Sequence, residues 1–442
     1  MKLFILINNW HTRQVDFVLA YPQAKVSHDV YMLPPEKFEY KDDKLQLNHE
    51  AMPPWKQRHR LKLLQNLYGL KDAGATWYKH LRDRLTKDMG FTQSLVDPCL
   101  FYRGKVVLVI YVDDCIIFTP EKAQADNLVE ELDKKFSIED EGDVTNYLGI
   151  HITRPTKDTI KMNQPALTQR IVDSLGLKDQ RMHDTPADPN ITLTKDEGGP
   201  ERQETFHYRS LVGQLNYLTA STRPEIQYAT HQLSRFSTSP KLIHEKAAKR
   251  LVRYLKNTVN EGIIMKPDRT QGLTCYVDAD FAGNWTADQA LDPRACLSRT
   301  GFVIFYANCP VIWQSKLQST ISLSTTEAEY VALSTAMRDV IYLIHLIDEI
   351  KEAGIELPNA SQPKTICRVF EDNVGALELA NTHKLRPRTK HLAVQLHHFR
   401  QYVLNKTIIV EKVDTQFQRA DIFTKALPRD AFRYLRKTII GW

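Results

Sequence analysis

The chain has 442 residues, of which 42% are hydrophobic and 25% charged, which is typical of folded globular domains and excludes a disordered, collagen-like or membrane-embedded chain. This length predicts two or three folding units, and six scattered cysteines without a CxxC pair argue against a zinc cluster or a disulfide framework. The net charge is +6, but residues 381–442 hold thirteen basic and four acidic side chains, so either a polyanion surface or a merely solvated basic face lies near the C-terminus. No apolar run approaches the roughly 20 residues of a membrane span, so we expect no membrane contact and an intracellular, cytoplasmic protein.

The first third of the chain mixes strands with helices. Residues 106–112 form an apolar, β-branched run that predicts a strand. Residues 121–136 predict a polar amphipathic helix, in which Leu128 and Leu132 recur at helical spacing. Residues 147–152 predict another short strand.

A change of composition at residues 185–200, which collect Pro, Asp, Thr and Gly, predicts a linker. Residues 206–257 are helical in character and end in a helix with one basic face, which either follows a phosphate backbone or is simply solvated. From residue 273 onward three antiparallel strands, a long helix at 326–353 and alternating strands and helices follow. This order, βββαβαβα, predicts a mixed α/β layer fold.

Two adjacent carboxylates, Asp113 and Asp114, end the strand predicted at 106–112, and a second apolar run follows them. This pattern predicts a hairpin with an acidic tight turn. Neighbouring carboxylates repel each other unless a cation neutralises them, so a divalent metal site fits, although acidic turns without function are common. Asp16 is a third acid inside an apolar, strand-like segment.

Several motifs resemble, in order and spacing, the reverse transcriptases of copia-type LTR retrotransposons. They are Asp16 with its surroundings, LLQNLYGLKDAGATWY at 63–78, YVDD at 111–114, YLGI at 147–150, YRSLVGQLNYL at 208–218, TRPEI at 222–226 and RYLKNT at 253–258. The last three are similar to the connecting region of the same Pol polyprotein. The resemblance therefore runs nearly from end to end.

The resemblance implies an RNA-directed DNA polymerase with a right-hand palm. In it, Asp16, Asp113 and Asp114 hold two Mg²⁺ ions, with Mn²⁺ as a substitute. It also implies an RNA template, a DNA primer and dNTPs as partners, together with other Pol segments. Tyr21 falls where such enzymes place an aromatic ring under the incoming sugar, with an ordinary core aromatic as the equal alternative. The family also makes virus-like particles or the nucleus possible locations.

Four further acids resemble, in order and wording, the DEDD metal site of ribonuclease H: Asp278, Glu329, Asp372 and Asp421. The resemblance implies ribonuclease H activity on RNA–DNA hybrids, with two cations that position a water against an RNA phosphate. On the predicted helix Glu329 shares a face with Leu333, so it is expected to point toward the sheet, whereas Glu327 points elsewhere.

Five basic side chains lie between the third and the fourth of these acids: Arg386, Arg388, Lys390, His391 and Arg400. We expect them to hold the phosphates of the hybrid beside the nuclease centre. Zinc binding by the histidines of this segment is disfavoured, because no cysteine lies at ligand spacing and the surroundings are basic.

The resemblance implies three parts along the chain. A reverse transcriptase with partial fingers, palm and the start of a thumb would span 1–184. A linker and helical thumb or connection would span 185–271, and a ribonuclease H-like domain with a mixed sheet would span 272–442.

Departures from the family pattern affect the expected activity. Only fifteen residues precede Asp16, so truncated fingers are expected. Asp72, expected at the nucleotide site, stands where Gln is usual, and Ala75 stands where Arg is usual. Both changes predict weaker nucleotide binding. Ala393 replaces a usual Asp, and no protease or integrase segment is found.

Two other functions remain open. A catalytically inactive remnant or a repurposed nucleic-acid-binding protein would bind hybrid with a steep salt dependence and no turnover. An unrelated hydrolase such as a glycosidase would need one pair of acids and would leave the second acidic set unexplained.

Overall fold

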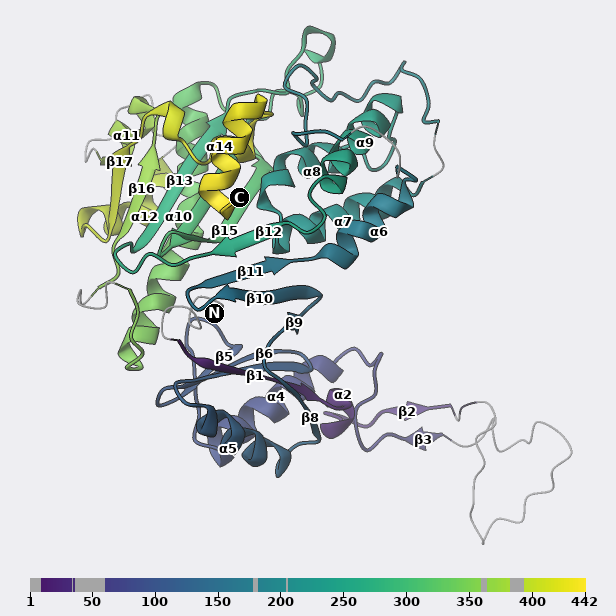
Figure 1. The fold of residues 1–442 in the computed structure, drawn as a ribbon, viewed down its shortest axis with the longest axis vertical. Helices are drawn as coiled ribbons and strands as arrows, with labels where there is room; N and C mark the ends of the chain where they lie inside the picture. Colours follow the sequence, from purple (N-terminus) through teal and green to yellow (C-terminus); the bar gives the residue numbers. More distant parts are fainter. Residues whose placement is uncertain are drawn as a thin grey trace, which may run out of the picture. The chain divides into compact units, whose positions relative to one another are not determined.

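The computed structural model describes residues 9–33, 35, 60–177, 182–203, 206–358, 364–381 and 393–442. It contains two compact units, one formed by Trp10–Val144 and the other by the chain from Thr145 onward. Helices and strands alternate in both units, so the protein has a mixed α/β fold with several sheets (Figure 1).

An antiparallel sheet of six strands forms the centre of the first unit. In sheet order the strands are β4 (Thr92–Gln93), β5 (Leu100–Arg103), β6 (Val106–Tyr111), β7 (Asp114–Thr119), β1 (His11–Phe17) and β8 (Ile138–Gly142). The other elements of the unit are α2 (Ala20–Gln23), β2 (Tyr31–Met32), β3 (Leu61–Lys62), α4 (Ala73–Asp83), η1 (Arg84–Asp88) and α5 (Lys122–Asp133). The strand predicted at 106–112 and the helix predicted at 121–136 are thus present as β6 and α5.

The core of this unit forms between the sheet and its helices. Val15 and Phe17 are buried on either side of the half-buried Asp16 along β1, and they share one buried cluster with Trp77 of α4 and Leu128 of α5. The rings of Phe17 and Trp77 meet edge to face with centroids 5.3 Å apart. This packing holds β1 and α4 together, and both elements bear on the acidic hairpin.

The second unit begins with a smaller sheet of four strands. In sheet order they are β12 (Gly262–Met265), β11 (Thr159–Asn163), β10 (Ile150–Thr156) and β9 (Asn146–Tyr147). The single strand predicted at 147–152 is wrong, because Leu148 and Gly149 adopt positive φ angles of 48° and 69° and form a tight turn between β9 and β10. The Tyr217 hydroxyl donates a hydrogen bond to the Leu148 carbonyl and closes this turn.

Helices occupy the middle of the second unit, as expected for 206–257. They are α6 (Pro165–Ser174), α7 (Tyr208–Ser221), η2 (Pro224–Ile226), α8 (Gln227–Ser234) and α9 (Leu242–Lys256). Because β11 pairs with β12, the second compact unit begins at Thr145 and includes elements on both sides of the predicted linker. The three-part functional division of the chain stays a prediction.

A mixed sheet of five strands follows. In sheet order the strands are β15 (Cys309–Leu317), β14 (Arg299–Tyr306), β13 (Leu273–Asp280), β16 (Cys367–Glu371) and β17 (Ile408–Lys412). The first three are antiparallel, as predicted, and β13, β16 and β17 run parallel. The accompanying helices are η3 (Ala287–Gln289), α10 (Thr325–Glu352), α11 (Val374–Asn381), α12 (Ala393–Leu404), η5 (Thr415–Phe417), α13 (Asp421–Thr424) and α14 (Arg429–Ile440).

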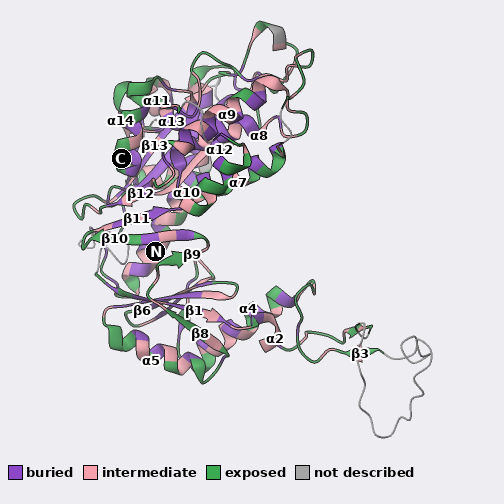
Figure 2. Cartoon of the chain, turned by 45° about the vertical axis from the view of Figure 1, so that its right-hand side comes forward, coloured by how far each residue is buried: buried purple, intermediate pink, exposed green. Residues whose placement is uncertain are grey.

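Helix α10 is long and apolar enough, by length and composition alone, to cross a membrane. We did not expect a segment of this kind from the sequence. Its apolar character has a packing explanation, because α10 lies against β13 and β14 and buries Tyr330, Leu333 and Met337 (Figure 2). It is the core helix of the mixed sheet.

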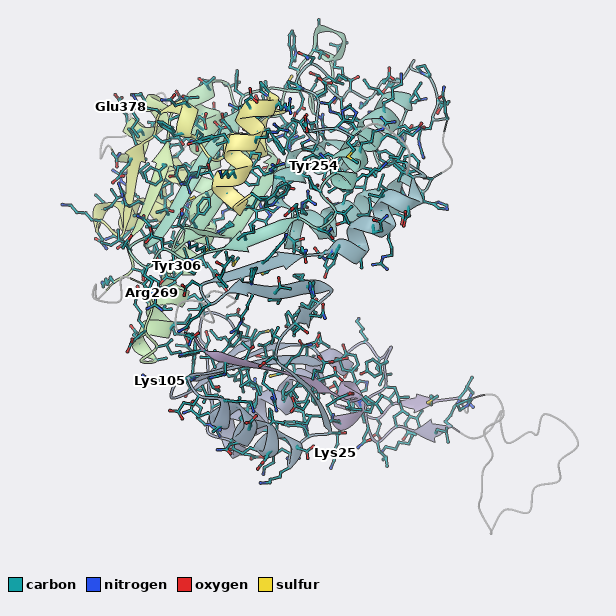
Figure 3. The ribbon with its side chains drawn as sticks, viewed as in Figure 1. Lys25, Lys105, Tyr254, Arg269, Tyr306 and Glu378 are labelled. Carbon is teal, nitrogen blue, oxygen red and sulfur yellow. The ribbon has the colours of Figure 1, made fainter. Side chains whose placement is uncertain are left out.

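A buried ion pair links η2 to the residues at and just after the end of α9. Arg223 lies 2.6 Å from Glu225, and the side chains of both are at most 1% exposed. The guanidinium also donates to the backbone carbonyl and the hydroxyl of Thr258, at 2.9 and 2.6 Å. Tyr254, labelled in Figure 3, adds a hydroxyl 3.3 Å from Glu225 and packs edge to face on Phe432 of α14. The TRPEI and RYLKNT motifs therefore meet in one structural network.

Candidate active sites

The acidic hairpin of the first unit is a tight turn between β6 and β7. Tyr111 pairs with Asp114, so only Val112 and Asp113 form the turn, and Val112 has a φ of 56°. This conformation is strained for a β-branched residue. The Val112 carbonyl accepts a hydrogen bond of 2.9 Å from the Trp77 indole, and the Asp113 carbonyl accepts one of 2.8 Å from the Phe17 amide. Helix α4 and strand β1 thus fix the turn.

Asp16 lies beside this turn, as the sequence predicted. It is the register partner of Asp114 on β7. Burial raises the pKa of Asp16, Asp113 and Asp114, and the charge of Asp16 raises the pKa of the other two further. A hydrogen bond from Tyr68 partly offsets the rise in the pKa of Asp113. The Oδ1 atom of Asp113 is buried without a hydrogen-bond partner in the described chain.

Two acids of β8 that the sequence analysis missed extend this carboxylate group. Glu139 is the register partner of Asp16 on the opposite side from Asp114. Burial raises the pKa of Glu141, and the charges of Asp114 and Asp16 raise it further. In the part of the chain that is described, Asp16, Asp113 and Asp114 do not form a set whose ligand atoms all lie within 4.8 Å of one another. The hairpin therefore carries neighbouring carboxylates, but among the described residues they do not form a set of three mutually close ligand atoms.

Tyr21 and Asp72 lie on α2 and just before α4. The Tyr21 ring packs on the buried cluster of this unit and meets the ring of Tyr68 at a centroid distance of 4.6 Å. Asp72 accepts a hydrogen bond from Ser27 and lies 3.6 Å from His28. The Ser27 hydrogen bond lowers the pKa of Asp72, which keeps this carboxylate charged. Tyr68, which contacts both Tyr21 and Asp113, was missed from the sequence.

The second acidic set converges in the mixed sheet. Asp278 lies on β13, Asp372 directly follows the neighbouring parallel strand β16, and Glu329 lies in the second turn of α10. One ligand atom from each of the three carboxylates lies within 4.8 Å of the other two. The sequence predicted all three residues, and the structure brings them together as a site that could hold a metal ion.

Local capping explains why Glu329, and not Glu327, belongs to this site. Ser324 caps α10 by accepting a hydrogen bond from the Glu327 amide, and the Glu327 carboxylate accepts one of 2.9 Å from the Leu323 amide. Glu327 is therefore occupied at the helix start. Glu329 lies two residues later on the buried face and is 7% exposed.

Electrostatics also favour a cation at this site. Burial, together with the charges of Asp278, Glu371 and Asp372, raises the pKa of Glu329 to about 11. Burial raises the pKa of Asp278 as well. The Oε2 atoms of Glu329 and Glu371 are buried and have no hydrogen-bond partner among the described residues. Carboxylates with unused buried oxygens suit a hard divalent cation, so the residues present fit a metal.

Glu371 was missed from the sequence, although a signal for it exists. Cys367, Val369 and Glu371 are buried alternately along β16, so Glu371 lies on the same face of the strand as two core residues. Its Oε1 atom accepts a hydrogen bond of 3.0 Å from the Asn373 amide. Alternate residues of a strand face the same side. Extending this alternation one residue beyond the apolar part of the strand would have predicted a buried glutamate next to Asp372.

Asp421 is connected to the other acids through two residues that follow it. The Thr424 hydroxyl donates to Oδ2 of Asp278, and Lys425 Nζ lies 2.9 Å from Oδ1 of Asp421 and 4.0 Å from Oδ2 of Asp278. Burial raises the pKa of Asp421 to about 7, and the charge of Asp278 contributes to this rise. Asp421 is thus a neighbour of the three-carboxylate set and not a member of it.

A glycine allows this approach. Gly301 is the register partner of Asp278 on β14. A Cβ atom there would lie 2.5 Å from Cγ2 of Thr424 and 2.9 Å from Cβ of Phe423, which is too close for either contact. Helix α13 can therefore rest directly on the sheet.

Of the five basic residues expected to hold the hybrid, only Arg400 lies among the described residues. Arg386, Arg388, Lys390 and His391 lie outside the described residues. Arg400, on α12, is half-buried, and its charge partly offsets the rise that burial causes in the pKa of Tyr330. Their role in binding a hybrid stays a prediction.

The basic face of α9 is held by the protein's own acceptors. Lys249 lies 2.8 Å from Glu245, Arg250 lies 2.8 Å from Asp188, and Lys256 donates to the Leu177 carbonyl at 3.0 Å. These pairings favour a structural role over a continuous track for phosphates.

Comparisons with known proteins agree with the motifs. Residues 2–189 match the model of the family "Reverse transcriptase (RNA-dependent DNA polymerase)". The solved N-terminal RNase H domain of a Mycobacterium tuberculosis protein matches with a TM-score of 0.24 at 16% identity, over 38% of this chain and 97% of that one. This structural likeness is too weak to define a fold.

Curated relatives match almost the whole chain. The retrovirus-related Pol polyprotein from transposon RE1 of Arabidopsis thaliana is 34% identical over 96% of this chain, and the one from transposon TNT 1-94 of Nicotiana tabacum is 30% identical over 97%. The chain spans 27% and 30% of the lengths of these relatives. The chain thus belongs to the family of copia-type retrotransposon Pol polyproteins and carries a reverse transcriptase family domain.

Proposed function

We propose that the protein is an RNA-directed DNA polymerase with ribonuclease H activity on RNA–DNA hybrids. The observation that carries the nuclease half is the convergence of Asp278, Glu329 and Asp372 from three separate elements to within 4.8 Å. Isolated surface acids do not explain this convergence, because Asp278 and Glu329 are buried. The reverse transcriptase family match supports the polymerase half.

In the nuclease half Asp278, Glu329 and Asp372 would hold Mg²⁺, with Asp421 as an outer carboxylate. A bound divalent cation would activate a water and stabilise the charge that develops on the phosphate. Asp278 is held in place by the Thr424 hydroxyl, and Glu329 by its position on the buried face of α10. The protein's own part is to keep these carboxylates fixed and desolvated. The RNA–DNA hybrid is the proposed substrate.

In the polymerase half Asp16, Asp113 and Asp114 would hold the catalytic Mg²⁺ ions in a palm formed by the six-stranded sheet. Tyr21 would lie under the sugar of the incoming dNTP and would be supported by Tyr68. The charged Asp72 would weaken triphosphate binding, because like charges repel. We assign residues 1–184 to the reverse transcriptase, 185–271 to the linker and connection, and 272–442 to the ribonuclease H part.

Paired assays test both halves. With Mg²⁺ or Mn²⁺, the chain is expected to cleave the RNA of a hybrid and to extend a DNA primer on an RNA template. Asp278→Asn is expected to reduce cleavage at least about 10³-fold while extension persists, and Asp113→Asn is expected to do the opposite. Absence of cleavage by the unaltered chain with either metal would refute the nuclease half.

One observation favours a second candidate for the first unit. The hairpin carboxylates lack a closed three-ligand set in the described chain, whereas the mixed sheet has one. A chain that binds template and primer without extending the primer, but cleaves hybrid, fits this difference. Primer extension that is lost in Asp113→Asn would exclude it.

A further inference from the structure

Lys425 places an ammonium group at one side of the acidic cluster in the mixed sheet. Its Nζ atom lies 2.9 Å from Asp421 and 4.0 Å from Asp278. The carboxylates of these two partners are only 13% and 5% exposed, whereas the lysine side chain is 42% exposed. The lysine therefore reaches from solvent into a largely buried anionic site.

The other side of the cluster has a different character. Asp278, Glu329 and Asp372 lie within 4.8 Å of one another, and Oε2 of Glu329 has no hydrogen-bond partner in the described chain. The two sides share Asp278, whose Oδ2 atom accepts the hydrogen bond from Thr424 and faces Lys425. One carboxylate thus belongs to both the three-acid set and an internal ion pair.

We propose that Lys425 is a built-in competitor for one of the two divalent ions that the proposed ribonuclease H function uses. Asp278, Glu329 and Asp372 bind the first ion tightly. A second ion between Asp278 and Asp421 has to displace the ammonium, because two cations about 4 Å apart repel strongly in a partly buried site. The inference rests on the proposed function and concerns the order in which its site fills.

The Lys425 side chain can also move away from the two carboxylates. Its side chain is flexible and partly in solvent, and it follows a helix of only four residues. A phosphodiester at the edge of the cluster offers the ammonium another anionic partner. Hybrid binding and binding of the second ion are therefore coupled, and the second ion binds more tightly when nucleic acid is present.

Metal-binding stoichiometry tests this proposal without any turnover. Mn²⁺ binding is measured by calorimetry and by electron paramagnetic resonance on the full chain carrying Asp16→Asn and Asp113→Asn, so that the hairpin acids contribute little. With Lys425 present we expect one tight ion and a second that binds at least about fivefold more weakly. In Lys425→Met the second affinity should rise at least about fivefold, while the first changes less than twofold.

Matched variants define the outcome. Lys425→Arg keeps the positive charge and should keep the original pattern. Lys437→Met removes an exposed lysine of α14 and should also leave the pattern unchanged. The proposal would be overturned if the ratio of the two affinities were the same in Lys425→Met as in the chain that keeps Lys425. Loss of the first ion in the folded Lys425→Met variant would also overturn it.

A second measurement needs no substitution at position 425. Acylation of individual lysines is followed by mass spectrometry as Mn²⁺ is added to the same full chain. Without metal, the amino group of Lys425 should be acylated more slowly than that of Lys437. Once the second ion binds, acylation at Lys425 should become faster than it is without metal. A rate at Lys425 that does not change with Mn²⁺ contradicts displacement.

The two proposals fail separately. Cleavage of hybrid together with unchanged Mn²⁺ affinities in Lys425→Met overturns the competition and leaves the ribonuclease H function. Competition by Lys425 without any hybrid cleavage by the unaltered chain overturns the function and leaves a two-state metal site.

Discussion

The surroundings of His231, on α8, lower the pKa of its imidazole ring. Burial, together with the charges of Arg299, Arg235 and Lys316, lowers its pKa to about 3. Its Nδ1 atom lies 2.9 Å from the Arg299 guanidinium, so the neutral ring accepts a hydrogen bond from it. The folded protein therefore resists protonation of this ring, whereas the unfolded chain does not.

This difference predicts a loss of stability in mild acid. Between the ordinary histidine pKa near 6.5 and about 3, the unfolded state binds one more proton at this position, so the free energy of unfolding falls as the pH falls. The slope from this group is at most about 1.4 kcal/mol per pH unit. In His231→Asn, which keeps an acceptor but not the titration, denaturant unfolding between pH 6.5 and 4 should show a shallower decline. A decline identical to that of the parent chain would contradict this prediction.

At the scale of elements, the buried pair of Arg223 and Glu225 joins η2 to the end of α9. Truncation of one partner leaves the other charge buried without compensation, which is strongly destabilising. We expect Glu225→Ala to lower the free energy of unfolding by about 3 kcal/mol, measured by denaturant unfolding. Glu201→Ala is the control, because Glu201 pairs with Lys241 but is 78% exposed, and it should cost less than about 1 kcal/mol. Similar costs for the two variants would show that the buried pair has no special weight.

The elements differ in how far the sequence predicts them. Strand β6 and helix α10 have long, regular patterns, and their ranges were predicted within one or two residues. The turn at Leu148 was not predicted, since a leucine with positive φ gives no local signal. Helix α12 was missed because its apolar periodicity is weak.

The site residues follow the same division. Each predicted acid of the mixed sheet lies in a distinct motif, and three of the four converge. Lys425 was overlooked because a lysine in a basic tail looks like solvated charge. Its contact with Asp278, 147 positions earlier in the chain, depends on tertiary packing that no local pattern contains.

At the scale of the whole molecule, the uneven charge is the main determinant of how the chain should bind nucleic acid. Residues 381–442 carry a net charge of +9, and the rest of the chain carries −3. Affinity for a hybrid should therefore fall steeply with salt, because bound phosphates release counterions. Replacing Arg386, Arg388 and Lys390 together by Ala should reduce the slope of log K against log salt by about 2 to 3.

This prediction is measured in the Asp278→Asn background, so that the hybrid stays intact during titration. The matched control replaces three exposed lysines of the first unit, namely Lys105, Lys134 and Lys135. That control should leave the slope within about 1 of the parent. A larger change in the control than in the C-terminal triple variant would place the nucleic-acid surface elsewhere.

The contact between Gly301 and α13 has a consequence for the history of such a chain. Any side chain at position 301 would push α13 away from β14 and take Asp421 and Lys425 away from Asp278. A single base change in one glycine codon could thus disable the proposed nuclease while every carboxylate codon stayed intact. Among copies of a mobile element that accumulate random changes, a glycine retained at this position would therefore be as telling a mark of selection as the acids themselves.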